Sequence, residues 1–502
     1  MSTIVDRPGT PWRGDLPCMV LLALVTLATR GVWFGDPVAD FDEQLYSFIG
    51  WRMGHGELPF AQWWDRKPFG LFAIYGAIHA LFGPSALAYQ LVAAGVTMGS
   101  ALLTFRLARR LVGRVSATIS AALMVMLLAA YSSYSGQSEV FFTPLMLGMA
   151  VLLVDPAHPH FTRRALWAML LGGLALQVKY TVIMQCIFFG GWALWVEWRR
   201  GRSLPQLAGI AALFAVLGLL PTLLVGLFYA VVGQFDAFWF ANFASFFERV
   251  AAPQGRWAPS FWLGVAPLAV LAAGGLYAAG RMARPAPLVA WTFFAGWSLS
   301  ALLTVLLPGT VYLYYYAAMA APVALLALPL LDSRGPAKAW PGFVLALLLL
   351  WLLALPARYQ QSQDERAATQ ALAEAIAPHV SDSECLWVWD GPTALYRLTG
   401  SCVPTHYVYP DHLNNALETG ALGVDQLAEV ERVLATRPGA VVTADTGMTL
   451  RNPQAAAVVE TRLARDYRPA LTVSLHGRQV TAWVARSASS APATTSTSPP
   501  QQ

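Results

Sequence analysis

DFDEQLYSFIGWRMGHGELPFAQWWDRKPFGLFAIYGAIHALFG, residues 40–83, is a charged stretch in a chain of which only 12% is charged. Ordinary soluble domains carry about 25% charged residues. The stretch follows the first long apolar segment, residues 16–34. Its charged residues include one group at the start, Asp40, Asp42 and Glu43, and a second group near the middle, Asp65, Arg66 and Lys67. The sequence therefore directs the search for chemistry to this stretch and suggests that the rest of the chain holds it in place.

The first half of the stretch places acidic side chains at helical spacing. Asp40 and Glu43 are three residues apart, so they would share one face of a helix, and Asp42 and Tyr46 are four apart. An ionised carboxylate at this place could accept the proton of an incoming hydroxyl group. We therefore regard Asp40, Asp42, Glu43 and Tyr46 as candidate site residues.

The second half of the stretch supplies the opposite charge. Arg66 and Lys67 follow Asp65, and Pro68 then bends the path of the chain. Two adjacent cations at a membrane surface suit a phosphate or pyrophosphate group. The same charged residues could instead form a solvated, salt-bridged loop without a catalytic role, and spacing alone does not decide between the two interpretations.

The order of these motifs resembles a known family. It consists of Asp42-Glu43-x-x-Tyr46, a turn at Gly56–Pro59 and Trp64-Asp65-Arg66-Lys67-Pro68 before an apolar helix. This order resembles the first extracytoplasmic loop of GT-C membrane glycosyltransferases. Within that superfamily it is similar to the protein mannosyltransferases of glycosyltransferase family 39, the aminoarabinose transferases and the rhizobial galacturonosyltransferases. The resemblance continues more weakly to about residue 357.

The resemblance implies roles for several residues of the loop. Asp42 would be the catalytic base and Glu43 would assist or orient it. Lys67, Arg66 and Lys179 would bind the phosphate of the donor. A divalent metal ion could bridge carboxylate and phosphate. Relatives differ on this point, and the spacing of the residues leaves it open.

Two further charged residues are candidates with a structural alternative. Glu139 stands at the start of an apolar helix, where the helix dipole alone would favour a carboxylate, although relatives often carry an acidic residue there. Lys179, in LQVKYTV, would contact an anionic donor or snorkel to the interface. Arg30, near the end of the first apolar segment, is expected to snorkel. Tyr314 stands where a histidine is common in the resembling families.

The composition indicates a polytopic α-helical membrane protein, because 56% of the chain is hydrophobic. About eleven crossings are expected from segments near the 20 residues that a bilayer requires. The expected crossings are 16–34, 85–105, 115–131, 140–154, 165–177, 180–195, 207–232, 261–280, 286–307, 312–331 and 340–355. Phe69–Phe82 is short and bounded by Pro68 and Gly83, so we expect an interfacial or re-entrant helix.

The basic residues predict the orientation. With Phe69–Phe82 left out of the count, the clusters Arg106–Arg114 and Arg199–Arg202 fall on the same side as the N-terminus. The positive-inside rule makes that side cytoplasmic. The loop 35–84 and the C-terminal part would then be periplasmic, in the inner membrane of a bacterium. The aromatic loop 233–260 would line a groove for a polyprenyl tail or anchor the chain in the headgroup layer.

The C-terminal part has a different composition. Residues 358–486 are expected to form a small soluble α/β domain after the catalytic domain 1–357, and residues 487–502 a disordered tail. Its expected elements are helices at 362–377 and 425–436, strands at 385–389 and 440–443, and a hairpin at 471–484 that turns near His476-Gly477. Cys385 and Cys402 could form a disulfide in an oxidising compartment, and the sequence leaves this open.

The expected function is transfer of a sugar from a polyprenyl-phosphate donor to an acceptor, with inversion, on the periplasmic face. The acceptor would be lipopolysaccharide, another cell-envelope glycan or a protein, and membrane lipids would be partners. The net charge of +5 does not imply nucleic acid, because the basic residues lie at helix ends. A transporter or flippase of lipid-linked sugars is the main alternative. A binding or assembly component without catalysis is a third. The sequence leaves the sugar, the acceptor and the oligomeric state open.

Overall fold

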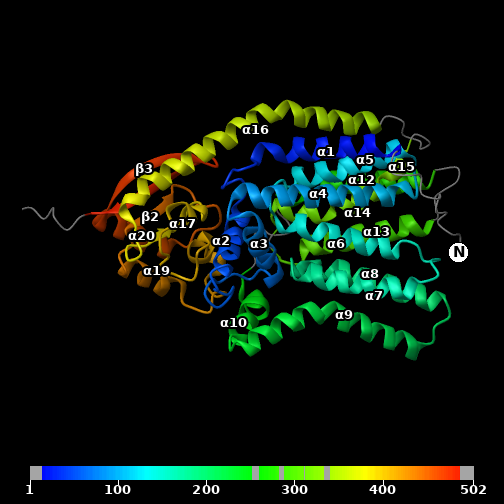
Figure 1. Ribbon diagram of the computed structural model, residues 1–502, viewed down its shortest axis with the longest axis horizontal. Coiled ribbons are helices and arrows are strands. Elements are labelled where there is room, and N and C mark those ends of the chain that lie inside the picture. The colour runs from blue at the N-terminus through cyan, green and yellow to red at the C-terminus, as the bar shows by residue number, and fades with distance from the viewer. Residues whose placement is uncertain (1–13, 251–258, 282–287, 310, 333–339, 487–502) are drawn as a thin grey trace, which may run out of the picture. The chain divides into compact units, whose positions relative to one another are not determined.

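The computed structural model describes residues 14–250, 259–281, 288–309, 311–332 and 340–486. The chain divides into two compact units, Met1–Asp364 and Glu365–Gln502 (Figure 1). The first is helical and the second contains the sheet, which confirms the predicted fold class. The tail predicted at residues 487–502 lies outside the described residues.

The helical unit is built from helices of very different length. They are α1 Leu16–Arg30, η2 Gly31–Trp33, α2 Phe41–Met53, α3 Phe69–Phe82, α4 Ala86–Arg109, α5 Arg114–Ala130, α6 Ser138–Leu153, α7 Phe161–Leu176, η3 Tyr180–Val182, α8 Ile183–Arg199, α9 Leu204–Val231, α10 Phe235–Trp239, η4 Phe240–Ala244, α11 Ser245–Glu248, α12 Pro259–Ala279, α13 Leu288–Leu306, η6 Leu313–Met319, α14 Ala320–Leu326, α15 Leu328–Leu331 and α16 Trp340–Ile376.

Within the described residues, six helices are long and apolar enough to cross a membrane. They are Leu16–Trp33, Ala86–Arg109, Tyr180–Arg199, Leu204–Val231, Phe261–Ala279 and Val289–Leu306. Shorter apolar helices occupy other predicted crossings, such as Arg114–Ala130 and Ser138–Leu153. The chain is therefore a multi-pass membrane protein, and the total of about eleven crossings stays a prediction.

Two predicted crossings have a different form. The expected crossing 312–331 is divided into η6, α14 and α15 rather than forming one helix. The helix expected to end at residue 355 continues through Pro356 as α16. The helix predicted at 362–377 is therefore present, but it is the second part of α16 and not a separate element. A proline removes one backbone donor and bends a helix, but neighbouring hydrogen bonds can carry the helix past it.

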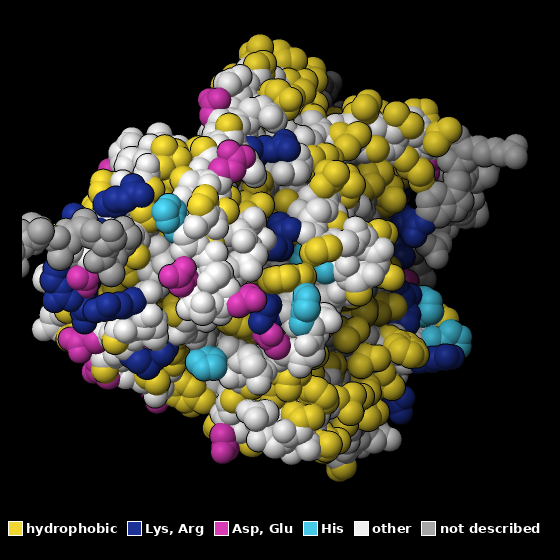
Figure 2. Space-filling view, turned by 60° about the vertical axis from the view of Figure 1, so that its left-hand side comes forward, with side chains coloured by type: hydrophobic (Ala, Val, Ile, Leu, Met, Phe, Trp, Pro, Cys, Tyr) yellow, Lys and Arg dark blue, Asp and Glu magenta, His cyan; other side chains and the backbone are white. Residues whose placement is uncertain are grey.

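The surface of the helical unit has the character of a protein that faces lipid. Helix α9 is apolar all round, and its exposed side chains include Leu213, Val216, Leu223, Leu227 and Val231. Figure 2 shows broad areas of hydrophobic side chains on this unit, whereas charged side chains gather on the C-terminal unit. A helix that is hydrophobic all round requires an apolar environment, which a bilayer supplies.

Helices α2 and α3 form a tightly packed hairpin. A Cβ atom on Gly50 of α2 would lie 2.7 Å from the backbone nitrogen of Gly76 in α3, so only glycine permits this approach. The hydroxyl of Tyr75, on α3, donates to the carbonyl of Gly136 at 2.6 Å. The predicted helix Phe69–Phe82 is confirmed as α3. The hairpin thus connects the charged loop to the segment between α5 and α6.

The C-terminal unit is a small α/β structure. Its elements after α16 are η7 Ala377–His379, β1 Leu386–Val388, α17 Ala394–Thr399, α18 Pro410–Asn414, η8 Ala416–Glu418, α19 Gln426–Ala435, β2 Ala440–Ala444, α20 Pro453–Asp466, β3 Tyr467–Leu475 and β4 Arg478–Ala485. The strand order is β1-β2-β4-β3, with β1 and β2 parallel and the other pairs antiparallel.

The predicted hairpin is confirmed, and it is longer than expected. His476 and Gly477 join β3 to β4 with φ angles of 51° and 74°. Two successive positive φ angles suit the right-handed twist of the flanking strands. The predicted strands near residues 385 and 440 are also present, whereas α20 was not predicted.

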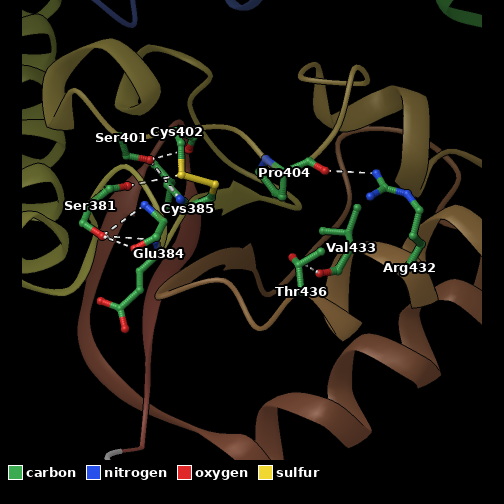
Figure 3. The surroundings of a disulfide bond; sticks show 11 residues. Ser381, Glu384, Cys385, Ser401, Cys402, Pro404, Arg432, Val433 and Thr436 are labelled. Atoms are coloured by element: carbon green, nitrogen blue, oxygen red, sulfur yellow. Dashed lines mark hydrogen bonds between the residues drawn. A yellow bond between two sulfur atoms is a disulfide. The ribbon is translucent and has the colours of Figure 1, made fainter.

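A disulfide joins Cys385 and Cys402 (Figure 3). The backbone nitrogen of Leu386 donates to the hydroxyl of Ser401 at 2.9 Å and to the carbonyl of Cys402 at 3.2 Å. The bridge therefore ties the start of β1 to the segment after α17. Cys18 and Cys186, in the helical unit, are free cysteines.

Candidate active site

Asp40 acts as the N-cap of α2. Its Oδ1 accepts from the backbone nitrogens of Asp42 at 2.9 Å and Glu43 at 3.3 Å. The side-chain amide of Gln137 donates to the same oxygen at 2.7 Å. Burial and the carboxylates of Glu43 and Asp42 raise the pKa of Asp40 well above its ordinary value. Asp40 therefore organises the start of the helix that carries the other candidates.

Asp42 and Tyr46 form the contact that their spacing predicted. The hydroxyl of Tyr46 donates to Oδ2 of Asp42 at 3.1 Å, one helical turn away. Burial, followed by the charge of Asp42, raises the pKa of Tyr46 well above its ordinary value. The Tyr46 hydroxyl therefore stays protonated, donates a hydrogen bond to Asp42 and does not act as a competing base.

Lys67 brings a cation to the same carboxylate. Its Nζ lies 3.6 Å from Oδ2 of Asp42 and 5.3 Å from the centre of the Tyr46 ring. Oδ1 of Asp65 accepts from the backbone nitrogen of Lys67 at 2.6 Å and so shapes the turn. Burial alone would lower the pKa of Lys67, but the carboxylates of Asp42 and Asp65 outweigh it and raise that pKa. Lys67 is thus held as a cation beside Asp42.

Glu139 and Lys179 form a second, more deeply buried pair. The ammonium of Lys179 donates to Oε1 of Glu139, whose other oxygen accepts from the Ser138 hydroxyl at 2.9 Å. Lys179 also lies over the rings of Tyr315 and Tyr314, at 4.2 and 5.1 Å from their centres. Lys179 is 6% exposed and Glu139 1%, so the pair is buried and Lys179 does not snorkel. Tyr314 contributes a ring face here.

The predicted phosphate-binding residues meet at one cavity. Arg66, Lys67 and Lys179 line a cavity of about 130 Å³. Arg249, from the segment after α11, lines it as well. The Arg66 guanidinium lies over the ring of Trp64 in a cation–π contact, 5.1 Å from the ring centre. Four cationic side chains from three separate segments therefore face one hollow, and such a hollow suits a phosphate group.

A second cavity adjoins this cationic cavity. It has a volume of about 300 Å³ and shares Arg66, Tyr180, Thr181 and Phe246 with the first. The remainder of its lining is mainly apolar and includes Phe243, Phe247, Leu176, Leu219 and Leu307. The aromatic segment 235–248 thus contributes to a groove beside the cationic cavity. Residues 251–258 of the predicted aromatic loop lie outside the described residues.

Glu43 lies apart from both cavities. It is fully buried, and its Oε2 accepts from the backbone nitrogen of Gly136 at 2.6 Å. Gln90 and Tyr89 donate to its Oε1 at 3.3 and 3.4 Å. Burial raises the pKa of Glu43 to about 7. Glu43 therefore connects α2 to the segment that leads into Glu139, and its predicted role of assisting or orienting Asp42 stays a prediction.

The predicted role of Arg30 is wrong. Arg30 is 2% exposed, and its guanidinium donates to the carbonyl of Ser133 at 3.0 Å and that of Ser135 at 2.8 Å. It therefore does not snorkel. Backbone carbonyls of the segment after α5 satisfy it instead. A charge within an apolar segment usually has such a partner, so this rule could have indicated that Arg30 is paired, but not with which groups.

The described residues do not group three or more His, Cys, Asp or Glu side chains in a way that could hold a metal ion. The polar neighbours of Asp42 include the Lys67 ammonium and the Tyr46 hydroxyl. A divalent metal ion at this place stays a prediction.

Sequence reasoning missed Arg249 and Tyr315 as site residues. Arg249 directly follows an aromatic helix, and Tyr315 lies in a run of tyrosines. Neither pattern reveals that the residue faces the cationic cavity. Only the packing of α11 and η6 near Lys179 brings them there.

The fold has counterparts among solved structures, and part of the helical unit matches a family model. Residues 66–224 match a family model described as dolichyl-phosphate-mannose-protein mannosyltransferase. No curated protein matches the chain in sequence.

Solved structures support the same class. ArnT from Cupriavidus metallidurans bound to undecaprenyl phosphate is 13% identical with a TM-score of 0.63. The apo state of that protein is 14% identical with a TM-score of 0.61. Both comparisons cover 94% of this chain and 98% of the other. At this identity the likeness is one of fold. Together with the family model it supports the predicted resemblance to the GT-C superfamily.

Proposed function

We propose that the chain is a membrane glycosyltransferase that transfers a sugar from a polyprenyl-phosphate donor to a hydroxyl-bearing acceptor. The observation that carries this proposal is the cationic cavity beside Asp42, with an apolar cavity next to it. A lipid-linked sugar phosphate has the matching chemistry, since it combines an anionic group with a long apolar tail.

The cationic cavity is the proposed phosphate subsite. Arg66 and Arg249 can offer planar pairs of donors to phosphate oxygens, and Lys67 and Lys179 act as point charges. Lys67 also contacts Asp42, so the phosphate and the base would be neighbours. The undecaprenyl phosphate bound to ArnT supports a ligand of this class.

The apolar cavity is the proposed site for the first isoprene units. Its aromatic and aliphatic lining from α9, η4 and α11 can cover apolar ligand surface and gain about 25 cal/mol per Å² removed from water. A free sugar phosphate would leave this surface uncovered. The proposed donor is therefore lipid-linked.

The proposed reaction inverts the anomeric configuration. The acceptor hydroxyl gives its proton to Asp42, and its oxygen forms a bond to the anomeric carbon from the face opposite the phosphate. The bond between that carbon and the phosphate oxygen breaks, and the phosphate leaves with the electron pair. Lys67, Arg66 and Lys179 stabilise the charge that develops on it. Tyr46 and Glu43 position Asp42, and no step requires a metal ion.

The proposed location is the inner membrane of a bacterium, with the site on the periplasmic face. The basic clusters support an N-terminus in the cytoplasm. The disulfide between Cys385 and Cys402 supports an oxidising compartment for the C-terminal unit. Candidate acceptors are lipopolysaccharide, another envelope glycan or a protein. The sugar could be a hexose or a pentose.

A transporter or flippase of lipid-linked sugars is the alternative from another class. It would also need a cationic site and an apolar groove. A transporter usually shows related halves with broken helices at the bilayer midplane. The interrupted segment η6, α14 and α15 is the feature that favours it most. The charges of this chain concentrate in the loop 35–84, and the sequence shows no two-fold repetition, which favours the enzyme.

The test uses purified protein in nanodiscs with a panel of polyprenyl-phosphate sugars and a soluble alcohol or glycan acceptor. Free polyprenyl phosphate and glycosylated acceptor are measured for the wild type, Asp42→Asn and Asp236→Asn. Asp236 is an exposed carboxylate on α10 and serves as the matched control. Carrier release that only Asp42→Asn abolishes supports the transferase. Labelled donor that crosses the bilayer of proteoliposomes without carrier release would establish the transporter instead.

A further inference from the structure

The C-terminal unit contains a cavity of about 380 Å³, larger than those of the helical unit described above. It is bounded by α20 on one side and by the ends of β2 and β4 on the other, with Val459, Leu463, Thr443 and Thr481 among its lining residues. Its size lies within the range of about 300–1,000 Å³ that is typical of small-ligand sites. All of its lining residues belong to the C-terminal unit, so the cavity is a property of that unit alone.

Two tryptophans line this cavity. Trp483, on β4, is half-buried, and its Nε1 donates to the hydroxyl of Thr443 on β2 at 2.9 Å. Trp389 directly follows β1 and is 3% exposed. The hydrogen bond to Thr443 holds the Trp483 ring in one orientation before any ligand binds. A rigid, partly exposed aromatic ring in a hollow is a ready platform for the apolar face of a ligand.

The polar groups of the cavity are both donors and acceptors. Gln479 and Thr481 of β4 and Glu460 of α20 face it. No hydrogen bond or ion pair engages Glu460 within the part of the chain that the structure describes. Such groups can accept and donate several hydrogen bonds at once.

The only cation that lines this cavity within the described residues is Arg451, which forms an ion pair with Asp390. A terminal nitrogen of Arg451 donates to Oδ2 of Asp390 at 2.7 Å, and Arg478 donates to the other oxygen at 2.7 Å. The Nε of Arg451 is buried and has no hydrogen-bond partner among the described residues. Asp445 and Glu460 add negative charge. A phosphorylated ligand is therefore disfavoured in this cavity.

We infer that this cavity binds a saccharide, either neutral or amino-bearing, and that this saccharide is the glycan part of the acceptor. The C–H face of a sugar ring would stack on Trp483, and its hydroxyl groups would bond to Gln479, Thr481 and Glu460. A lipid tail would leave these polar groups unsatisfied, at a cost that a saccharide avoids. The identity of the saccharide as the acceptor rests on the proposed transferase function, but its binding does not.

The test measures binding directly and without turnover. The full-length protein in nanodiscs is titrated with neutral and amino-bearing di- to tetrasaccharides, followed by saturation-transfer NMR and tryptophan fluorescence. We expect at least one of these saccharides to bind. Trp483→Ala and Glu460→Gln should each weaken binding about tenfold, as the loss of one stacking or hydrogen-bonding contact predicts. Glu460 is exposed on α20, so Glu460→Gln should fold normally. It therefore tests the inference even if Trp483→Ala does not fold.

Asp382→Asn, an exposed change elsewhere in the same unit, is the matched control and should leave binding unchanged. Binding of no saccharide, or binding that neither variant weakens, would overturn the inference, as would a peptide that binds in place of every saccharide. In the transfer assay, Glu460→Gln should raise KM for a glycan acceptor and leave kcat unchanged. If no donor supports transfer but saccharide binding is lost in Trp483→Ala, the proposed function fails while the cavity remains a saccharide site.

Discussion

The ammonium nitrogen of Lys67 lies 3.6 Å from Oδ2 of Asp42, and the same oxygen accepts a hydrogen bond from the hydroxyl of Tyr46 at 3.1 Å. The base proposed for the acceptor and a cation proposed for the leaving phosphate are thus direct neighbours. An adjacent cation favours the ionised form of a carboxylate, which is the form that a base requires. In the proposed reaction, this arrangement would couple proton removal from the acceptor to stabilisation of the departing phosphate.

Asp42→Asn should lower the rate of sugar transfer by about 100-fold or more, because loss of a general base costs about 10²–10⁴ in rate. The amide keeps the shape of the side chain and can still contact Tyr46. Binding of the donor, measured by its protection of the protein against thermal unfolding, should change little. Full activity in Asp42→Asn would remove Asp42 from catalysis.

Lys179→Met should destabilise the protein because it leaves Glu139 buried without its cation. Removal of one member of a buried pair typically costs about 3–5 kcal/mol. The double variant Lys179→Met, Glu139→Gln should recover much of the melting temperature, since neither charge then remains. It should not recover donor affinity, because the proposed phosphate contact is still absent. Recovery of both would show that Lys179 has a structural role only.

The pH dependence of stability should change in Glu43→Gln. Burial raises the pKa of Glu43 from 4.5 to about 7, so the folded chain holds this proton more tightly than the unfolded chain does. The stability that results is fully present below pH 4.5 and is lost as the pH rises through about 7. The loss is at most about 3.5 kcal/mol, since one pKa unit corresponds to about 1.4 kcal/mol.

Glutamine cannot lose a proton in this range, so Glu43→Gln should melt with a flatter pH profile than the wild type. Some slope should remain, because the pKa of Asp40 is raised as well. Thermal melts in detergent between about pH 5 and pH 8 measure this effect, with Asp236→Asn as the control. Parallel profiles for wild type and Glu43→Gln would contradict the assignment.

Replacement of Cys385 and Cys402 by serine should destabilise the C-terminal unit. The bridge joins residues 17 positions apart, and a loop of this length predicts about 3 kcal/mol. Limited proteolysis should cleave the variant faster between residues 365 and 486. Thiol labelling of the denatured, unreduced wild type should modify Cys18 and Cys186 only. Labelling of all four cysteines in protein isolated from cells would contradict both the bridge and the periplasmic location.

Several parts of this protein could be predicted from local sequence. The apolar segments, the helix Phe69–Phe82 and the turn at His476-Gly477 each depend on hydrophobic length or on backbone conformations that neighbouring residues set. The contact between Asp42 and Tyr46 follows from helical spacing alone. For the same reason, residue composition and spacing suffice to predict the membrane class and the general position of the site.

Other features were decided only by tertiary packing. Arg30 binds the carbonyls of Ser133 and Ser135, more than one hundred positions away in the chain, so no local pattern predicts it. The pairing of Lys179 with Glu139 and the approach of Arg249 to Arg66 likewise depend on how separate helices pack. A buried charge requires a partner, but the sequence does not say which of many distant groups supplies it. The sequence by itself thus determined the membrane class and most of the helices and strands. The tertiary structure determined the partners of the charged groups, because burial and charge pairing depend on distances that only the folded chain defines.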